Sequence, residues 1–169
     1  MNFKKYIRVF NGLFIFAKGK AQSDGIEPYL IKSQTTYLNQ LNSEIEAGRL
    51  EAKDDLSIIR LQEKEQSSAD MKTLACKGKT SKSKDYWWVF TQKLNSCDTN
   101  EFAADLSSAG TIAGGGALLL TYFGFSPALP AGLGSGYFHL MGSRASANNK
   151  GKGINIKFWW TFVYKFSPQ

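Results

Sequence analysis

The sequence predicts an α+β protein: a helical N-terminal pro-segment followed by a Gly/Ala-rich apolar helical hairpin flanked by two aromatic antiparallel strands. Three observations give this prediction. Charge is divided into blocks along the chain. Two aromatic segments, 85–91 and 154–166, have the composition or the alternation of strands. Between them, the segment 106–143 contains no Lys, Arg, Asp or Glu.

Composition excludes several classes of protein. The 169 residues carry a net charge of +7, and aromatic residues make up 14% of the chain, too many for a disordered protein. The mean hydropathy of −0.28 excludes a polytopic membrane protein. One histidine and two cysteines exclude a His/Cys zinc cage built from one chain.

Residues 1–21 carry a net charge of +5 and have the layout of a signal peptide, although Arg8 and Asn11 interrupt its apolar part. Lys4 and Lys5 precede the mostly apolar segment 6–17, and Gly19-Lys20-Ala21 offers small residues for cleavage. We therefore expect a secreted protein. The alternative is an amphipathic N-terminal helix that is retained.

Residues 22–70 carry a net charge of −5, and their leucines and isoleucines recur at helical spacing up to Leu56 and Ile59. An acidic helical segment complements the basic remainder of the chain. We expect a pro-segment that is removed by a processing protease between about Gln66 and Lys84. The alternative is an exposed helical hairpin or a soluble spacer.

Residues 71–84 form a lysine-rich linker. The linker could bind an anionic lipid or cell-wall polymer, or serve as a protease site. The alternative is a solvated, flexible linker. Cys76 in this linker and Cys97 are the two cysteines, and in an oxidising compartment they are expected to pair.

Residues 85–169 form the predicted cationic domain. We expect a strand at 85–91, a helix start with Asp98 as N-cap, and a final strand pairing antiparallel with the first. Trp and Tyr favour membrane interfaces, and lysines favour anionic head groups. The predicted anchors are Trp87, Trp88, Trp159 and Trp160, and the predicted anion-binding residues are Lys93, Lys150, Lys152 and Lys157.

The uncharged segment divides at Ser126–Pro130 into two apolar arms, 107–125 and 131–147. Small residues four apart allow helices to approach closely in lipid. The predicted helix–helix contact residues are Gly110, Gly114, Gly132 and Gly136. The alternative is that both arms are core helices of a soluble domain.

Residues 85–157 resemble the enterococcin/corynicin group of modular secreted bacteriocins of Gram-positive bacteria. The positions that carry the resemblance are Asn95, Cys97, Asn100, Phe102, Ala103, Ala104 and Leu106, the Gly/Ala-rich segment, and Ala147–Ile154. The resemblance implies a signal and a pro-region before a cationic antimicrobial domain. The aromatic extension 158–166 goes beyond the pattern of that group.

We therefore expect a secreted bacteriocin-like protein, made as a precursor, that acts on bacterial membranes without catalysis. No catalytic constellation, cofactor motif or metal motif is present in the sequence. The expected partners are an anionic membrane or cell envelope, the processing protease and a cognate immunity protein. Nucleic acid is not expected, because the long uncharged segment does not suit it. The alternative function is a membrane-associated immunity or toxin-binding protein.

Overall fold

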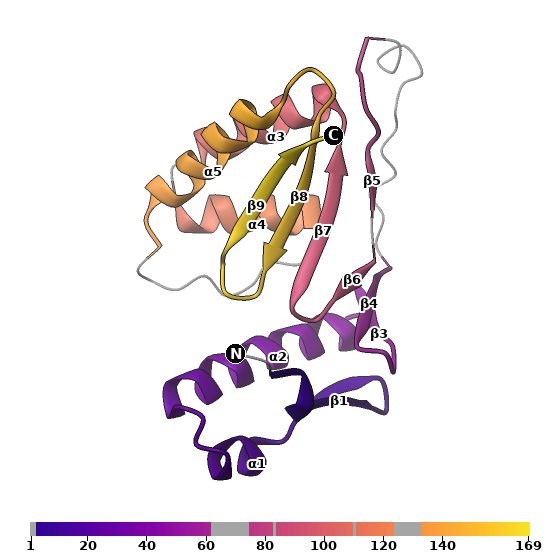
Figure 1. Ribbon diagram of the computed structural model, residues 1–169, viewed down its shortest axis with the longest axis vertical. Helices are drawn as coiled ribbons and strands as arrows, with labels where there is room; N and C mark the ends of the chain where they lie inside the picture. The colour runs from indigo at the N-terminus through magenta and orange to yellow at the C-terminus, as the bar shows by residue number, and fades with distance from the viewer. Residues whose placement is uncertain (1–2, 62–74, 83, 110, 124–132) are drawn as a thin grey trace. The chain divides into compact units, whose positions relative to one another are not determined.

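A computed structural model describes residues 3–61, 75–82, 84–109, 111–123 and 133–169 (Figure 1). The chain divides into two compact units. Unit 1 comprises Met1–Gln62 with Asp85–Trp87, and unit 2 comprises Glu63–Lys84 with Trp88–Gln169. Both units combine helices with antiparallel strands, which confirms the predicted α+β class.

Unit 1 combines helices with short antiparallel strands, and a β-hairpin lies near its start. Its elements are η1 (Phe3–Tyr6), β1 (Ile7–Phe10), β2 (Leu13–Phe16), α1 (Lys18–Ser23), α2 (Pro28–Glu46), β3 (Leu50–Ala52), β4 (Ser57–Arg60) and β6 (Asp85–Tyr86). Strands β1 and β2 are antiparallel and are joined by Asn11-Gly12, both with positive φ, as a two-residue hairpin loop requires.

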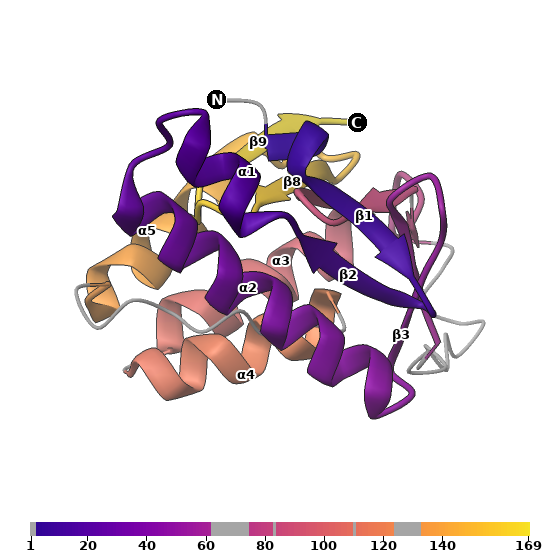
Figure 2. The ribbon, with the colours of Figure 1, turned by 90° about the horizontal axis from the view of Figure 1, so that it is seen from below.

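The hairpin is fastened to helix α2, which lies beside it in Figure 2. The Asn42 side chain accepts a hydrogen bond from the Phe14 backbone N–H at 2.8 Å and donates one to the Phe14 carbonyl at 2.9 Å. Phe3, Tyr6 and Phe14 are buried. The segment predicted as a signal peptide is therefore folded into unit 1 in this structure.

Helix α2 confirms the helical character of the acidic segment, but the helix ends at Glu46. The second helical run predicted around Leu56 and Ile59 is wrong, because Ser57–Arg60 forms strand β4, antiparallel to β3. An Asp55 carboxylate oxygen accepts the Ser57 N–H at 3.0 Å and shapes the turn before this strand.

Residues 85–87 are held in unit 1 by buried polar contacts. Arg60 Nε donates to Asp85 Oδ2 at 2.6 Å, and both side chains are 3% exposed. The Tyr37 hydroxyl donates to the Trp87 carbonyl at 2.6 Å. The predicted continuous strand 85–91 is therefore wrong: Trp87 and Trp88 form a turn, and the chain enters unit 2 there.

Unit 2 is a sheet with helices on one face (Figure 1). Its elements are β5 (Ser81–Lys82), β7 (Val89–Leu94), α3 (Ser96–Ser108), α4 (Ile112–Phe123), α5 (Ser135–Asn148), β8 (Ile154–Trp159) and β9 (Tyr164–Pro168). The predicted antiparallel ladder is present between β7 and β8, from Val89↔Trp159 to Leu94↔Ile154. Strand β9 returns beside β8.

The core of unit 2 lies between the helices and the inner face of the sheet. Phe90, Ile156 and Phe158 are buried from the strands, and helix residues meet them. The rings of Phe123 and Phe158 lie 5.8 Å apart, and those of Phe102 and Phe166 lie 6.3 Å apart. Alternation along β8 therefore decides which residues face the core.

Helices α4 and α5 lie in the two predicted apolar arms, and α3 precedes them; α5 packs chiefly against α3 rather than α4, so the two arms are not seen to pair as the predicted hairpin. Helix α3 occupies the start of the first predicted arm, and α4 begins only at Ile112. Helix α3 begins at Ser96, with Asn95 rather than Asp98 as its N-cap. Over the described residues, no helix is long and apolar enough to cross a membrane. The proline-containing tip of the hairpin lies outside the described residues.

Candidate anion-binding surface

The outer face of strands β7, β8 and β9 carries lysines and no acidic residue. The residues on this face are Val89, Thr91, Lys93, Asn155, Lys157, Trp159, Lys165 and Ser167. Lys93, Lys157 and Lys165 are exposed, whereas their neighbours along the strands, Leu94, Ile156, Phe158 and Phe166, are buried. We call these eight residues the outer sheet face; its formal charge is +3.

Two of these lysines are direct cross-strand partners. Lys157 in β8 pairs with Lys165 in β9, and Thr91 flanks Lys157 on the other side. Side chains of directly opposed residues lie close together in an antiparallel pair, and like charges there are destabilising. An anion bound between Lys157 and Lys165 would relieve this repulsion. Sequence reasoning selected Lys93 and Lys157 and missed Lys165, although the alternation of 154–166 places Lys157 and Lys165 on the same side.

The four predicted tryptophan anchors differ in exposure. Trp159 is half-buried on the outer sheet face. Trp88 and Trp160 are also half-buried, and the backbone N–H of Trp160 donates to the backbone carbonyl of Trp88 at 3.3 Å. Trp87 is only 2% exposed. In the full chain, Trp87 is therefore not accessible to a membrane, because it belongs to the packed part of unit 1.

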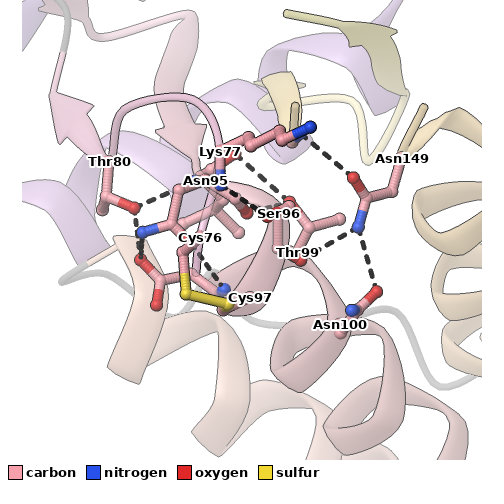
Figure 3. Close-up of a disulfide and its surroundings, with 12 residues drawn as sticks. Cys76, Lys77, Thr80, Asn95, Ser96, Cys97, Thr99, Asn100 and Asn149 are labelled. Atoms are coloured by element: carbon pink, nitrogen blue, oxygen red, sulfur yellow. Dashed lines mark hydrogen bonds between the residues drawn. A yellow bond between two sulfur atoms is a disulfide. The ribbon is translucent and has the colours of Figure 1, made fainter. Parts of the chain in front are cut away.

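The predicted disulfide joins the lysine linker to helix α3. Cys76 and Cys97 are bonded with their Cα atoms 5.4 Å apart (Figure 3). The Ser96 N–H donates to the Lys77 carbonyl at 2.8 Å, and the Lys77 N–H donates to the Ser96 hydroxyl at 3.0 Å. The loop that follows Cys76 is thus held against the N-terminus of α3 at several points.

Lys150 and Lys152 lie on the turn between α5 and β8, outside the strands that form the outer sheet face. Asn149 fixes the start of this turn: its amide donates to the Ser96 carbonyl and to Asn100 Oδ1, each at 2.9 Å (Figure 3). Its own side-chain oxygen accepts the Gly153 N–H at 3.0 Å. The four predicted lysines therefore fall into two groups: Lys150 and Lys152 lie on this turn, and Lys93 and Lys157 lie on the outer sheet face.

The C-terminal glutamine completes this arrangement, and sequence reasoning missed it. Gln169 Nε2 donates to the carbonyls of Lys79 at 2.9 Å and Leu94 at 2.7 Å, and Gln169 Oε1 accepts the Lys79 N–H at 3.1 Å. No sequence pattern marks a terminal glutamine as an anchor of this kind.

Among the described glycines, the closest approaches to a neighbouring helix occur at Gly142 and Gly115. A Cβ atom at Gly142 would lie 2.7 Å from the Ala103 carbonyl oxygen, and one at Gly115 would lie 2.3 Å from the Phe138 ring. Apart from the backbone of its own helix, a Cβ atom at Gly114 would have Thr111 Oγ1 as its nearest neighbour at 3.3 Å, and one at Gly136 would have no neighbour within 4 Å. The other two predicted contact residues, Gly110 and Gly132, lie outside the described residues.

Comparison with protein-family models, with curated proteins and with solved structures found no match. The resemblance of residues 85–157 to secreted bacteriocins therefore stays a prediction. Within the described residues, no group of three or more His, Cys, Asp and Glu side chains is placed to hold a metal ion.

Proposed function

We propose that this protein is a secreted, bacteriocin-like antimicrobial, made as a precursor, that acts without catalysis on anionic bacterial membranes. The observation that carries the proposal is the outer sheet face, where three exposed lysines and Trp159 share one surface without an acidic residue. A cationic surface with an aromatic side chain at its edge suits the interface of an anionic bilayer.

The expected strength of this contact follows from the charges. Each lysine near an anionic bilayer contributes about 1 kcal/mol, so Lys93, Lys157 and Lys165 together contribute about 3 kcal/mol at moderate salt. That is weak on its own, and apolar burial of tryptophan adds to it at about 25 cal/mol per Å². Adsorption is therefore salt-dependent in its first step and less so once aromatic side chains are buried.

The pro-segment has a defined target for masking. Trp87 belongs to unit 1 and is buried, and its backbone carbonyl accepts the Tyr37 hydroxyl beside the Arg60–Asp85 ion pair. Proteolysis between about Gln66 and Lys84 that falls before Cys76 would release the N-terminal piece and expose the Trp87 indole, whereas cleavage after Cys76 would leave the two pieces joined by the disulfide. Removal of the acidic segment would thus add an aromatic anchor and leave the basic part of the chain.

The disulfide supports export, and the N-terminal sequence of the exported protein tests it. The Cys76–Cys97 bond suits an oxidising compartment. Removal of residues 1–21 would take the β1–β2 hairpin from unit 1, so signal cleavage and removal of the pro-segment would both dismantle the same unit. N-terminal sequencing of exported protein would identify each cleavage point.

The test compares the intact disulfide-bonded chain with the same chain after limited proteolysis in the segment 66–84. Dye release from anionic vesicles and growth inhibition of Gram-positive cells are measured for both. We expect the cleaved protein to be the more active in both assays. If folded, oxidised protein causes neither leakage nor inhibition, the antimicrobial proposal fails. Protection of cells that express a neighbouring toxin would then assign the immunity or toxin-binding function.

A further inference from the structure

Two Lys-Gly-Lys turns from distant parts of the chain lie against each other in unit 2. The first is Lys77-Gly78-Lys79, after Cys76, and the second is Lys150-Gly151-Lys152, before β8. All four lysines are exposed. Both central glycines have positive φ, +87° at Gly78 and +85° at Gly151. We call this pair of turns the double lysine turn.

Backbone contact brings the two turns together. A Cβ atom at Gly78 would lie 1.7 Å from the Lys152 carbonyl oxygen, so only glycine allows this approach. The neighbouring residues are fixed by side chains that bond to the backbone of each turn. The Gln169 side chain bonds to both the backbone N–H and the backbone carbonyl of Lys79. The Asn149 side chain bonds to the Gly153 N–H, directly after the second turn, and to the Ser96 carbonyl beside the first.

This support exceeds what a solvated loop needs. The disulfide and the paired bonds between Ser96 and Lys77 hold the first turn. Directly after it, the Thr80 hydroxyl accepts the Asn95 N–H and donates to the Asp98 carboxylate. Holding four like charges on adjacent turns is electrostatically unfavourable in the absence of an anion. Pre-organised cations lose less conformational entropy when an anion binds, which increases affinity.

We propose that the double lysine turn binds the phosphodiester groups of a hydrophilic polyol-phosphate polymer of the cell envelope. The proposal rests on the proposed envelope-directed function and names a second ligand for it. Lysine ammonium groups are point charges that suit phosphate oxygens from any direction. Four of them on two neighbouring turns can contact successive phosphates of one chain.

The residues around these turns favour a polymer over a lipid or a nucleic acid. The two turns and their supports Thr80, Asn149 and Gln169 contribute no aromatic or large apolar side chain. Insertion into a bilayer interface requires such side chains, and binding of single-stranded nucleic acid uses aromatic rings on which bases stack. Strand β8 begins next to the double lysine turn, and its tryptophan, Trp159, lies at the opposite end of the strand.

The test measures binding of the intact, oxidised chain to poly(glycerol phosphate) by calorimetry over a series of salt concentrations. The variant K79Q/K150Q/K152Q removes three lysines of the double turn, and K93Q/K157Q/K165Q removes three from the outer sheet face. We expect the first variant to lose about tenfold or more in affinity and to show a salt slope lower by about 2, since each lost phosphate contact lowers the slope. The second variant keeps affinity within about threefold and instead loses vesicle adsorption.

Two further arms make the result decisive. The charge-preserving variant K79R/K150R/K152R should restore binding, which separates loss of charge from loss of fold. Single-stranded DNA and phosphatidylglycerol vesicles are measured beside the polymer. Equal loss in both glutamine variants overturns the proposal, as does tighter binding to DNA, or binding to vesicles without binding to the polymer. Dye release and growth inhibition report separately on the proposed function, so either claim can fail alone.

Discussion

Replacing Asp85 with asparagine should selectively destabilise unit 1. In the native protein, Arg60 and Asp85 are both 3% exposed and are bonded at 2.6 Å. Asparagine keeps the shape of the side chain but removes the negative charge that faces the buried guanidinium. Breaking a buried ion pair in this way costs about 3–5 kcal/mol. A unit of this size has a total stability of the same order, so D85N should leave unit 1 largely unfolded near its normal working temperature.

Hydrogen exchange of the full chain measures this effect unit by unit. Peptides from α2 and from 85–87 should lose protection in D85N, whereas peptides from α3 and β8 should keep it. The matched control R60M/D85L removes both charges, and replacement of a buried pair by apolar residues is near neutral in stability. The reasoning is refuted if D85N costs less than about 1 kcal/mol, or if the double variant is as unstable as the single one.

Three more predictions follow from the described contacts. Gly142→Ala should destabilise unit 2 by about 1–3 kcal/mol, because the new Cβ would meet the backbone of α3. Gly114→Ala should instead stabilise α4 by about 1 kcal/mol, because the new Cβ meets only a threonine hydroxyl at 3.3 Å; thermal unfolding of both variants measures the two effects. Burial and the nearby Asp85 charge raise the pKa of Tyr37 well above its usual value of 10.0. The stability that the neutral hydroxyl contributes is therefore complete below about pH 10 and is lost as pH rises through the raised pKa. In denaturant titrations at a series of pH values, Tyr37→Phe should lose less stability at alkaline pH than the wild type. Reduction of Cys76–Cys97 should lower the stability of unit 2 by about 3 kcal/mol, and an unchanged denaturation midpoint after complete reduction would contradict this.

The fold class and the sheet of unit 2 follow from local sequence patterns. Alternation in 154–166 assigns Ile156 and Phe158 to the core and Lys157 to the outer face, and the structure agrees. The hairpin β1–β2 was missed because an apolar segment after two lysines fits a signal peptide as well as it fits a strand pair. Its marker, Asn11-Gly12, is a strong hairpin signal that the charge pattern outweighed.

The candidate site could be predicted only in part. Which lysines belong together depends on the packing of α5 against α3 and on the register of β9 with β8, and neither can be deduced from spacing in the sequence. The approach of Gly78 to Lys152 joins segments more than seventy residues apart. The break at Trp87 depends on Arg60 and Tyr37, whose bonds to residues 85–87 leave no local signature.

Adsorption of the intact chain to vesicles tests the central claim most directly. Wild-type protein, K93Q/K157Q/K165Q and the charge-matched control K18Q/K20Q/K32Q, whose lysines are exposed in unit 1, are titrated with phosphatidylglycerol vesicles and with zwitterionic vesicles at low salt. We predict that wild type and control adsorb to the anionic vesicles alone, and that the outer-sheet-face variant loses about 3 kcal/mol of binding, roughly a hundredfold. Equal adsorption of all three proteins, or binding that ignores lipid charge, would contradict the account.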